Sequence, residues 1–292
     1  MMKNLVPRVA AVHDISCFGR CSLTVIMPIL SAMGIQVCPL PTAVLSTHLG
    51  GFKDLAFCDF TSYMSDFFHH WKSEGIAFDC IYSGFLASVE QIDVVQHFID
   101  EFSSNSPLVI VDPVMGDEGK LYSIYTPQMQ EQMKRLVQRA DIVTPNYTEA
   151  CFLLGETYQE KVYDIEKMRE WLISLAAFGP SIVVMTGIPF ENEKILTIGY
   201  DKKQNVFWEV FNDYIPAKYP GTGDIFASVL IGSLLYKDSL PTAMKRATEF
   251  TGLAIKTTFR ANAPAREGVL VEKVLSWLCT EAKQESFNYK ED

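Results

Sequence analysis

Short apolar runs, separated by longer amphipathic stretches, recur along the chain and constrain its fold more than any other feature. Leu108–Asp112 (LVIVD) and Ser181–Thr186 (SIVVMT) are apolar at nearly every position, which is typical of parallel strands that helices cover on both faces. The predicted strands are Arg8–His13, Gln36–Pro39, Asp79–Ser83, Leu108–Asp112, Asp141–Thr144 and Ser181–Thr186. The predicted helices are Thr24–Met33, Ser88–Phe102, Pro127–Ala140, Ile165–Phe178, Asp224–Tyr236, Pro241–Thr258 and Val269–Thr280.

This alternation of strand and helix predicts a three-layer α/β/α sandwich with a mostly parallel central sheet. A polar Asp-Lys-Lys-Gln segment separates Lys194–Tyr200 from Asn205–Phe211. This pattern predicts an antiparallel hairpin near one edge of the sheet. No Pro/Gly/Ser-rich linker or internal repeat divides the sequence. We therefore expect a single domain over residues 1–292, with a polar tail at about 283–292.

Charge and cysteine usage narrow the class of protein. A formal net charge of −10 argues against nucleic acid or an anionic membrane surface as the partner. No apolar run reaches the ~18 residues that a membrane span needs. The seven cysteines are scattered and form no C-x-x-C, so neither a disulfide framework nor a zinc site is indicated. We expect a cytoplasmic protein with reduced thiols.

The segment Pro220-Gly221-Thr222-Gly223-Asp224 precedes an apolar run, IFASVLIGSLLY. Two glycines around a threonine allow a tight turn that exposes successive N–H groups at a helix N-terminus, where an anion is stabilised. Asp224 stands beside that anion site. The segment has two interpretations: an anion-binding turn with a catalytic carboxylate, or a turn in which Thr222 or Asp224 only caps the helix.

Phosphoryl transfer needs this combination of groups. Fixed N–H dipoles stabilise the charge of the transferred phosphoryl group, and a carboxylate within hydrogen-bond reach takes the proton of the acceptor hydroxyl. The chain has no Walker-type G-x-x-x-x-G-K-[ST] loop and no protein-kinase H-R-D or D-F-G motif. A kinase built on this sequence therefore belongs to another class.

Polar residues follow two of the predicted strands. Asp112 ends LVIVD, while Thr144, Asn146 and Glu149 follow the next strand along the chain. The carboxyl ends of parallel strands meet at one edge of a sheet, where ligands bind. Carboxylate and amide oxygens at that edge suit a hydrated Mg²⁺. Asn146 and Glu149 also match a helix-capping box, and both interpretations can hold together.

These segments occur in an order that resembles the ribokinase-like superfamily. The matching segments are G-T-G-D at Gly221–Asp224, D-P-V-M-G at Asp112–Gly116, T-P-N-x-x-E at Thr144–Glu149 and V-M-T-G at Val184–Gly187. Within the superfamily the chain resembles the pyridoxal/pyridoxamine kinase family through S-G-F-L at Ser83–Leu86 and P-L-P-T…S-T-H within Pro39–His48. The resemblance covers roughly residues 8 to 280.

The resemblance implies phosphorylation of the 5′-hydroxymethyl group of pyridoxal, pyridoxamine or pyridoxine by a homodimer that uses ATP, Mg²⁺ and K⁺. Asp224 is implied as the general base, and the anion hole comprises Gly221, Thr222 and Gly223. The residues implied around the nucleotide are Asp112, Thr144, Asn146, Glu149, Thr186 and Gly187, with Ile215 and Ala217 near the adenine. The implied metal ligands are Asp112 and Glu149 for Mg²⁺, partly through water, and Thr144 and Thr186 for a monovalent cation. The residues implied around the acceptor ring or its cover are Asp14, Thr42, His48, Phe85 and Tyr122.

The chain departs from the family pattern just after its first predicted strand. Better-known members carry Ser-His where this sequence has Asp14-Ile15, and the serine contacts the pyridine nitrogen. An ionised Asp14 accepts a hydrogen bond only from a protonated ring nitrogen, so the departure bears on which vitamer is preferred and on whether pyridoxal is the natural substrate. The alternative is that Asp14 caps a short turn before Phe18-Gly19.

Two alternative functions stay open. A hydroxymethylpyrimidine kinase performs the same chemistry, but that branch carries G-G-A-G where this chain has Phe18–Ser22, and often Cys in place of Asp224. A non-catalytic ligand-binding relative would keep the fold without turnover, which the retention of Asp224, Asn146 and Glu149 disfavours. A sugar or nucleoside kinase is disfavoured because it has no counterpart to Ser83–Leu86.

Overall fold

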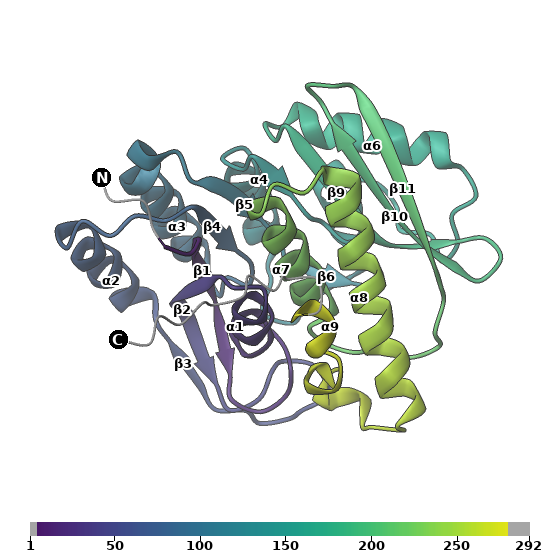
Figure 1. Cartoon of the computed structure of the whole chain (residues 1–292), viewed down its shortest axis with the longest axis horizontal. Coiled ribbons are helices and arrows are strands. Elements are labelled where there is room, and N and C mark those ends of the chain that lie inside the picture. Colours follow the sequence, from purple (N-terminus) through teal and green to yellow (C-terminus); the bar gives the residue numbers. More distant parts are fainter. Residues whose placement is uncertain (1–4, 280–292) are drawn as a thin grey trace, which may run out of the picture.

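The computed structural model describes residues 5–279, in which a nine-stranded sheet has the order β11-β10-β9-β8-β5-β4-β1-β2-β3 (Figure 1). The strands are β1 (Arg8–Ser16), β2 (Gln36–Leu45), β3 (Phe57–Asp59), β4 (Cys80–Ser83), β5 (Leu108–Val111), β8 (Ile142–Val143), β9 (Ile182–Phe190), β10 (Lys194–Asp201) and β11 (Val206–Asp213). Neighbours from β9 through β2 pair in parallel. The β10–β11 hairpin forms one edge, and β3 pairs antiparallel at the other. The predicted parallel sheet with an edge hairpin is confirmed.

Helices cover both faces of this sheet. On one face lie α1 (Leu23–Ala32), α7 (Thr222–Leu235), α8 (Leu240–Arg260) and the short α9 (Ser276–Cys279). On the other lie α2 (Thr61–Ser73), α3 (Val89–Phe102), α4 (Pro127–Val137), α5 (Tyr147–Leu154) and α6 (Ile165–Ala177). The predicted three-layer α/β/α architecture is confirmed.

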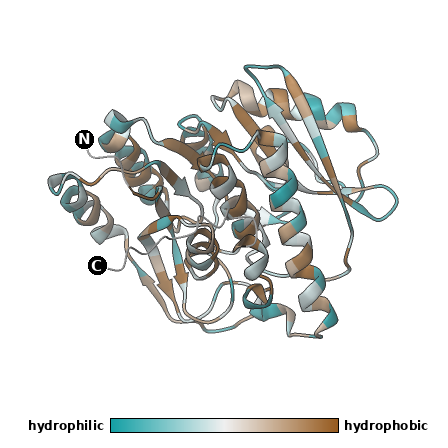
Figure 2. Ribbon diagram, in the orientation of Figure 1, coloured by the Kyte–Doolittle hydropathy of each residue, from teal (hydrophilic) through white to brown (hydrophobic). Residues whose placement is uncertain are grey.

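The central strand β1 shows why its sequence is apolar throughout. Val9 and Ala11 pack into the core under α1 and α7, whereas Ala10 and Val12 pack into the core on the opposite face. Successive side chains of a strand point to opposite faces, so a sheet that is covered twice needs apolar residues at consecutive positions. Helix α7 packs against both α1 and α8 and is hydrophobic along most of its length (Figure 2).

Strand β1 is longer than predicted and ends at Ser16 instead of His13. Its pairing with β2 shifts register between His13 and Ile15, which marks a bulge at Asp14. Asp14 therefore lies within the strand, and the prediction that it caps a turn before Phe18 is wrong. A bulge redirects a side chain next to a site, and here it affects the residue that departs from the family pattern.

The C-terminal segment also differs from the prediction. Within the predicted helix Val269–Thr280, the described part forms a 3₁₀ turn at Val271–Lys273 and the four-residue α9. The Leu270 amide donates to the Thr258 hydroxyl at 2.8 Å instead of entering a helical ladder. Thr280 and the predicted polar tail lie outside the described residues.

One full helix and several short elements were not predicted from the sequence. They are β3, α2, the small hairpin β6 (Gly116–Asp117) with β7 (Lys120–Leu121), and the 3₁₀ turns Ser103–Asn105 and Ala265–Glu267. Within residues 5–279, no helix combines the length and the apolar character that a membrane span requires.

Candidate active site

The turn before α7 is built around Gly221. This residue is the N-cap of α7 with φ +80°, and a Cβ atom there would overlap the carbonyl oxygen of Arg20. Glycine is therefore required both by the backbone conformation and by the close approach. Gly223 is exposed, and the nearest atom to a Cβ built on it is Asp112 Oδ2 at 3.8 Å. The turn leaves the first-turn N–H groups of α7 open to an anion.

Neither Thr222 nor Asp224 caps α7, so the cap-only interpretation of this segment is wrong. The N-cap has no side-chain hydrogen bond, and the Thr222 hydroxyl donates back to the carbonyl of Tyr219 at 3.3 Å. The Asp224 carboxylate instead accepts a 2.7 Å hydrogen bond at Oδ2 from the Ser22 amide. The carboxylate is thus held by a loop about 200 residues earlier in the chain.

Burial makes Asp224 a weaker acid than an exposed aspartate. Its side chain is 13% exposed, and burial raises its pKa from 3.8 to about 7, while the Ser22 amide lowers it and Asp14 raises it further. A group whose pKa lies near the working pH can both accept and release a proton. Asp224 therefore has the acidity of a general base.

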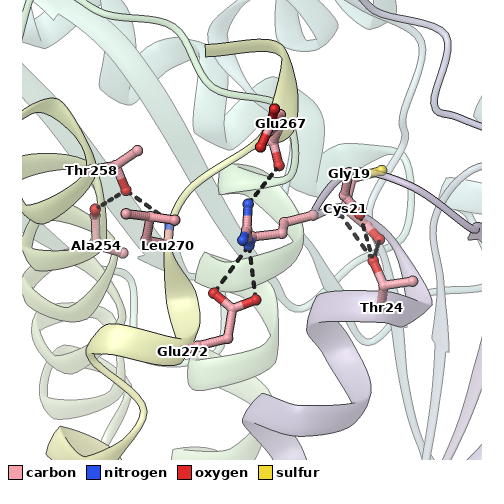
Figure 3. A network of polar contacts seen from close by, with 9 residues as sticks. Gly19, Cys21, Thr24, Ala254, Thr258, Glu267, Leu270 and Glu272 are labelled. Carbon is pink, nitrogen blue, oxygen red and sulfur yellow. Dashed lines mark hydrogen bonds and ion pairs between the residues drawn. The ribbon is translucent and has the colours of Figure 1, made fainter. Parts of the chain in front are cut away.

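The loop that presents Ser22 is fixed to the C-terminal segment (Figure 3). Ser22 has φ +49°, an uncommon conformation outside glycine. Two residues earlier, the Arg20 Nε contacts both carboxylate oxygens of Glu272 at 2.8 and 3.0 Å, while its backbone amide and Nη1 donate to the Glu267 carbonyl. The Arg20 carbonyl also lies 2.6 Å from the position a Cβ on Gly268 would take. The loop backbone that donates to Asp224 is therefore held both by Glu272 and by the Glu267–Gly268 segment.

Asn146 and Glu149 begin α5 with the predicted capping box, which is confirmed. Asn146 Oδ1 accepts from the Glu149 amide at 2.9 Å, and Glu149 Oε2 accepts from the Asn146 amide at 2.8 Å. The second carboxylate oxygen, Oε1, accepts from the Met115 amide at 3.1 Å, and Asn146 Nδ2 donates to the Gly116 carbonyl at 2.9 Å. These bonds join the loop after β5 to the start of α5.

Three carboxylates gather at this end of the sheet. Burial and the neighbouring Asp224 raise the pKa of Asp112, and burial and Asp112 raise the pKa of Glu149. A cation would relieve the repulsion between these groups, so the donor set fits Mg²⁺. Within residues 5–279, however, no three His, Cys, Asp or Glu side chains are arranged to hold a metal directly. The donors fit a cation whose remaining ligands are water and phosphate.

Among the remaining predicted nucleotide residues, Thr144 follows β8, Thr186 and Gly187 lie within β9, and Ile215 and Ala217 lie between β11 and α7. Thr186 forms a parallel bridge with Asn146, and Gly187 follows it with φ +67°. The hydroxyl of Thr144 is buried and has no hydrogen-bond partner among the described residues, so it is free for a ligand such as a monovalent cation. The Ala217 amide donates to the Ile215 carbonyl at 2.7 Å, which folds this connection into a tight turn.

The predicted acceptor residues come from several elements: Asp14 lies on β1 and Thr42 on β2, and the loops after β2, β4 and β7 carry His48, Phe85 and Tyr122. Burial raises the pKa of Asp14, while hydrogen bonds from Ser22 and Ser16 lower it, the latter at 2.9 Å. Thr42 donates to the Phe85 carbonyl at 3.0 Å, which joins two predicted residues. Tyr122 is 38% exposed.

His48 uses both ring nitrogens within the protein. Nδ1 accepts from the Gly50 amide at 3.0 Å, and Nε2 lies 2.6 Å from the Arg266 carbonyl. The protonated nitrogen must therefore be Nε2. Its imidazole ties the loop after β2 to the turn after α8.

Sequence reasoning missed His13 and the Ser22 amide. His13 precedes Asp14 on β1 and is fully buried, and its Nδ1 lies 3.9 Å from Asp224 Oδ1. In the sequence it is one polar residue in an apolar strand, without a motif. The Ser22 amide is a backbone group, so no residue type in the sequence could have indicated its contact with Asp224.

Comparisons with known proteins agree with this geometry. The family described as phosphomethylpyrimidine kinase matches residues 69–267. A Bacteroides thetaiotaomicron protein, provisionally described as a phosphomethylpyrimidine kinase, is 45% identical, with a TM-score of 0.91 over 95% of this chain and 96% of that protein. A second crystal form of that protein contains pyridoxal.

Two curated relatives have different substrates in their names. The pyridoxal kinase of Arabidopsis thaliana is 29% identical, covering 78% of this chain and 75% of the relative. The hydroxymethylpyrimidine/phosphomethylpyrimidine kinase of Bacillus subtilis is also 29% identical, covering 64% and 66%. This chain belongs to the phosphomethylpyrimidine kinase family, within the ribokinase-like superfamily, and is an ATP-dependent small-molecule kinase related to the pyridoxal kinases.

Proposed function

We propose that this kinase transfers the γ-phosphate of ATP to the 5′-hydroxymethyl group of pyridoxal, pyridoxamine or pyridoxine, with Asp224 as the general base. One observation carries the proposal: a largely buried carboxylate with a pKa of about 7 lies beside an open glycine turn at the N-terminus of α7. Such a turn binds a phosphate, and such a carboxylate accepts the proton of an alcohol.

In this reaction Asp224 takes the hydroxyl proton as the alcohol oxygen attacks the γ-phosphorus. The new P–O bond forms while the bond to the β–γ bridging oxygen breaks, and ADP leaves with the electron pair. The amides of Gly221–Gly223 stabilise the charge on the transferred group. With a pKa of about 7, Asp224 then returns the proton to water at neutral pH.

Asn146, Thr186 and Gly187 would lie along the phosphates, with Ile215 and Ala217 near the adenine. Mg²⁺, held through water by Asp112 and Glu149, would neutralise charge on the phosphates. The unpartnered hydroxyl of Thr144 supports a monovalent-cation site shared with Thr186.

For the acceptor, Asp14, Thr42, His48, Phe85 and Tyr122 would surround the ring or its cover. The pyridoxal bound to the 45% identical Bacteroides protein supports a pyridine substrate. Since both nitrogens of His48 contact backbone, its role would be to hold the cover in place. The homodimer and the cytoplasmic location implied by the family stay predictions.

The second candidate is a hydroxymethylpyrimidine kinase, which the family match and the Bacillus subtilis relative favour. A coupled assay that measures ADP release from ATP separates the candidates when it is run with pyridoxal, pyridoxamine, pyridoxine and hydroxymethylpyrimidine. We expect the highest kcat/KM on a pyridine alcohol. A higher value on hydroxymethylpyrimidine would reverse the assignment, and no turnover on any of the four would favour a non-catalytic relative.

A further inference from the structure

His13 is the one buried imidazole of the described chain whose two ring nitrogens both lack a hydrogen-bond partner. Buried polar groups are nearly always paired, so an unpaired one calls for an explanation. A residue that served only to fill the core would leave no reason for an imidazole here. Leucine would fill a similar volume without two desolvated nitrogens.

The groups packed around the His13 ring hold it close to Asp224. Its Nδ1 lies 3.9 Å from Asp224 Oδ1. The Tyr82 ring packs against it with centroids 4.3 Å apart. On another side, a Cβ atom on Gly84 would overlap His13 Cε1, so that glycine makes the room for the ring.

Among the described residues, one carboxylate oxygen of Asp224 also lacks a hydrogen-bond donor. Oδ2 accepts from the Ser22 amide, whereas no described residue donates to Oδ1 within hydrogen-bond distance. A carboxylate held at one oxygen can still rotate about that contact. A donor at Oδ1 would fix the plane of the carboxylate and the direction of its lone pairs.

The distance favours a direct contact over a bridging water. A water with two normal hydrogen bonds at a tetrahedral angle spans about 4.6 Å, which exceeds the 3.9 Å observed. Closing the gap to about 2.9 Å needs a movement of about 1 Å. Catalytic hydrogen bonds are often long before substrate binds and tighten in the complex.

We propose that His13 is a positioning residue for the base, whose neutral Nδ1–H donates a hydrogen bond to Asp224 Oδ1 and orients the carboxylate toward the acceptor hydroxyl. Burial lowers the pKa of His13 to about 3, so the imidazole is neutral at working pH and can donate from one nitrogen only. The proposal rests on the proposed role of Asp224 as the base.

Two substitutions separate positioning from packing. In His13→Asn the side-chain amide can occupy the place of Nδ1, whereas His13→Leu keeps the branched shape without a donor. We expect kcat to fall on the order of 10- to 100-fold in His13→Leu, which is the factor that a hydrogen bond to a charged group contributes, with the KM for ATP nearly unchanged. His13→Asn should recover most of that loss.

Stability should follow a different order from activity. His13→Leu removes two unpaired buried nitrogens and should have a Tm no lower than the wild type, whereas His13→Asn should be less stable than His13→Leu. An unchanged kcat in His13→Leu, or an equal loss in both variants, would overturn the positioning role.

Gly84→Ala offers an independent test because its added methyl group displaces the imidazole of His13 while leaving that residue in place. The added methyl overlaps His13 Cε1 and Nδ1, and an alanine at position 13 has no atoms at either place. We expect Gly84→Ala to lower kcat in the wild type and to have little further effect in the His13→Ala background. An equal effect in both backgrounds would contradict the proposal.

One measurement does not depend on activity. Histidines labelled with ¹⁵N report their tautomers by NMR, and the His13→Asn spectrum assigns the His13 signals. We expect the Nδ1–H form at His13 in the wild type and its loss in Asp224→Ala, with His48 in the Nε2–H form as an internal reference. An Nε2–H form at His13 would refute the inference. A wild-type protein with the expected tautomer and no turnover would instead refute the proposed function.

Discussion

Replacing Asp224 with asparagine should weaken catalysis and strengthen the fold in the same molecule. Asparagine keeps the size of the side chain and can still accept the Ser22 amide, but it is not a base. Turnover should therefore fall by roughly 10²–10⁴-fold, the contribution of a general base, while ATP still binds.

The gain in stability follows from the pKa of Asp224. Burial raises it from 3.8 to about 7, so the folded state binds a proton over a range in which the unfolded state has lost it. Stability is therefore lost as pH rises from about 4 to about 7. A shift of about three units corresponds to about 4 kcal/mol. Because the side chain keeps 13% exposure, we expect Asp224→Asn to add about 2–4 kcal/mol at pH 8.

Urea unfolding at pH 8 and pH 4, without nucleotide or Mg²⁺, measures this difference. At pH 4 both forms of the residue are largely neutral in the folded state, so the gain should shrink below about 1 kcal/mol. Asp213→Asn is the matched control, because Asp213 is 82% exposed and pairs with Lys194, and it should give no gain at pH 8. A gain of equal size at both pH values, or a loss at pH 8, would show that ionised Asp224 is not a strained group.

Three further predictions concern the same site. Because Asp224 must be ionised to act as the base, kcat/KM should fall tenfold per unit below about pH 7 and level off above it; a flat profile between pH 5 and 8 would contradict this. Glu149→Gln should raise the half-saturating Mg²⁺ concentration while leaving the acceptor KM nearly unchanged, and a magnesium titration that gives the reverse pattern would remove Glu149 from the metal side. Asp14→Ser should change the ratios of kcat/KM among pyridoxal, pyridoxamine and pyridoxine by on the order of 10- to 100-fold, since a carboxylate favours a protonated ring nitrogen; unchanged ratios across pH would mean that Asp14 points away from the ring.

Local patterns in the sequence predicted those features that depend on neighbouring residues. The apolar run at Leu108–Asp112 gave a central strand because burial on both faces leaves no room for polar alternation. The glycines around Thr222 marked the start of α7, and Asn146 with Glu149 marked the start of α5. In each case the physical cause lies within a few residues.

Features that depend on distant residues could not be predicted in this way. The hydrogen bond from the Ser22 amide to Asp224 joins residues 202 positions apart, and only the folded sheet brings them together. The burial that raises the pKa of Asp224 is a property of the same assembly. The bulge at Asp14 arises from the register between β1 and β2, and the C-terminal segment forgoes a longer helix for contacts with α8 and Arg20.

The contacts that anchor Arg20 determine when, during synthesis, the loop that carries Ser22 becomes fixed. Arg20 leaves the ribosome early, whereas its partners Glu267 and Glu272 emerge 247 and 252 residues later. A nascent chain can therefore build the parallel strands and the residues proposed to bind nucleotide before the loop that carries Ser22 has its partners in the C-terminal segment. If Asp224 has its proposed role, we expect catalytic competence only once the segment that carries Glu267 and Glu272 has folded against this loop.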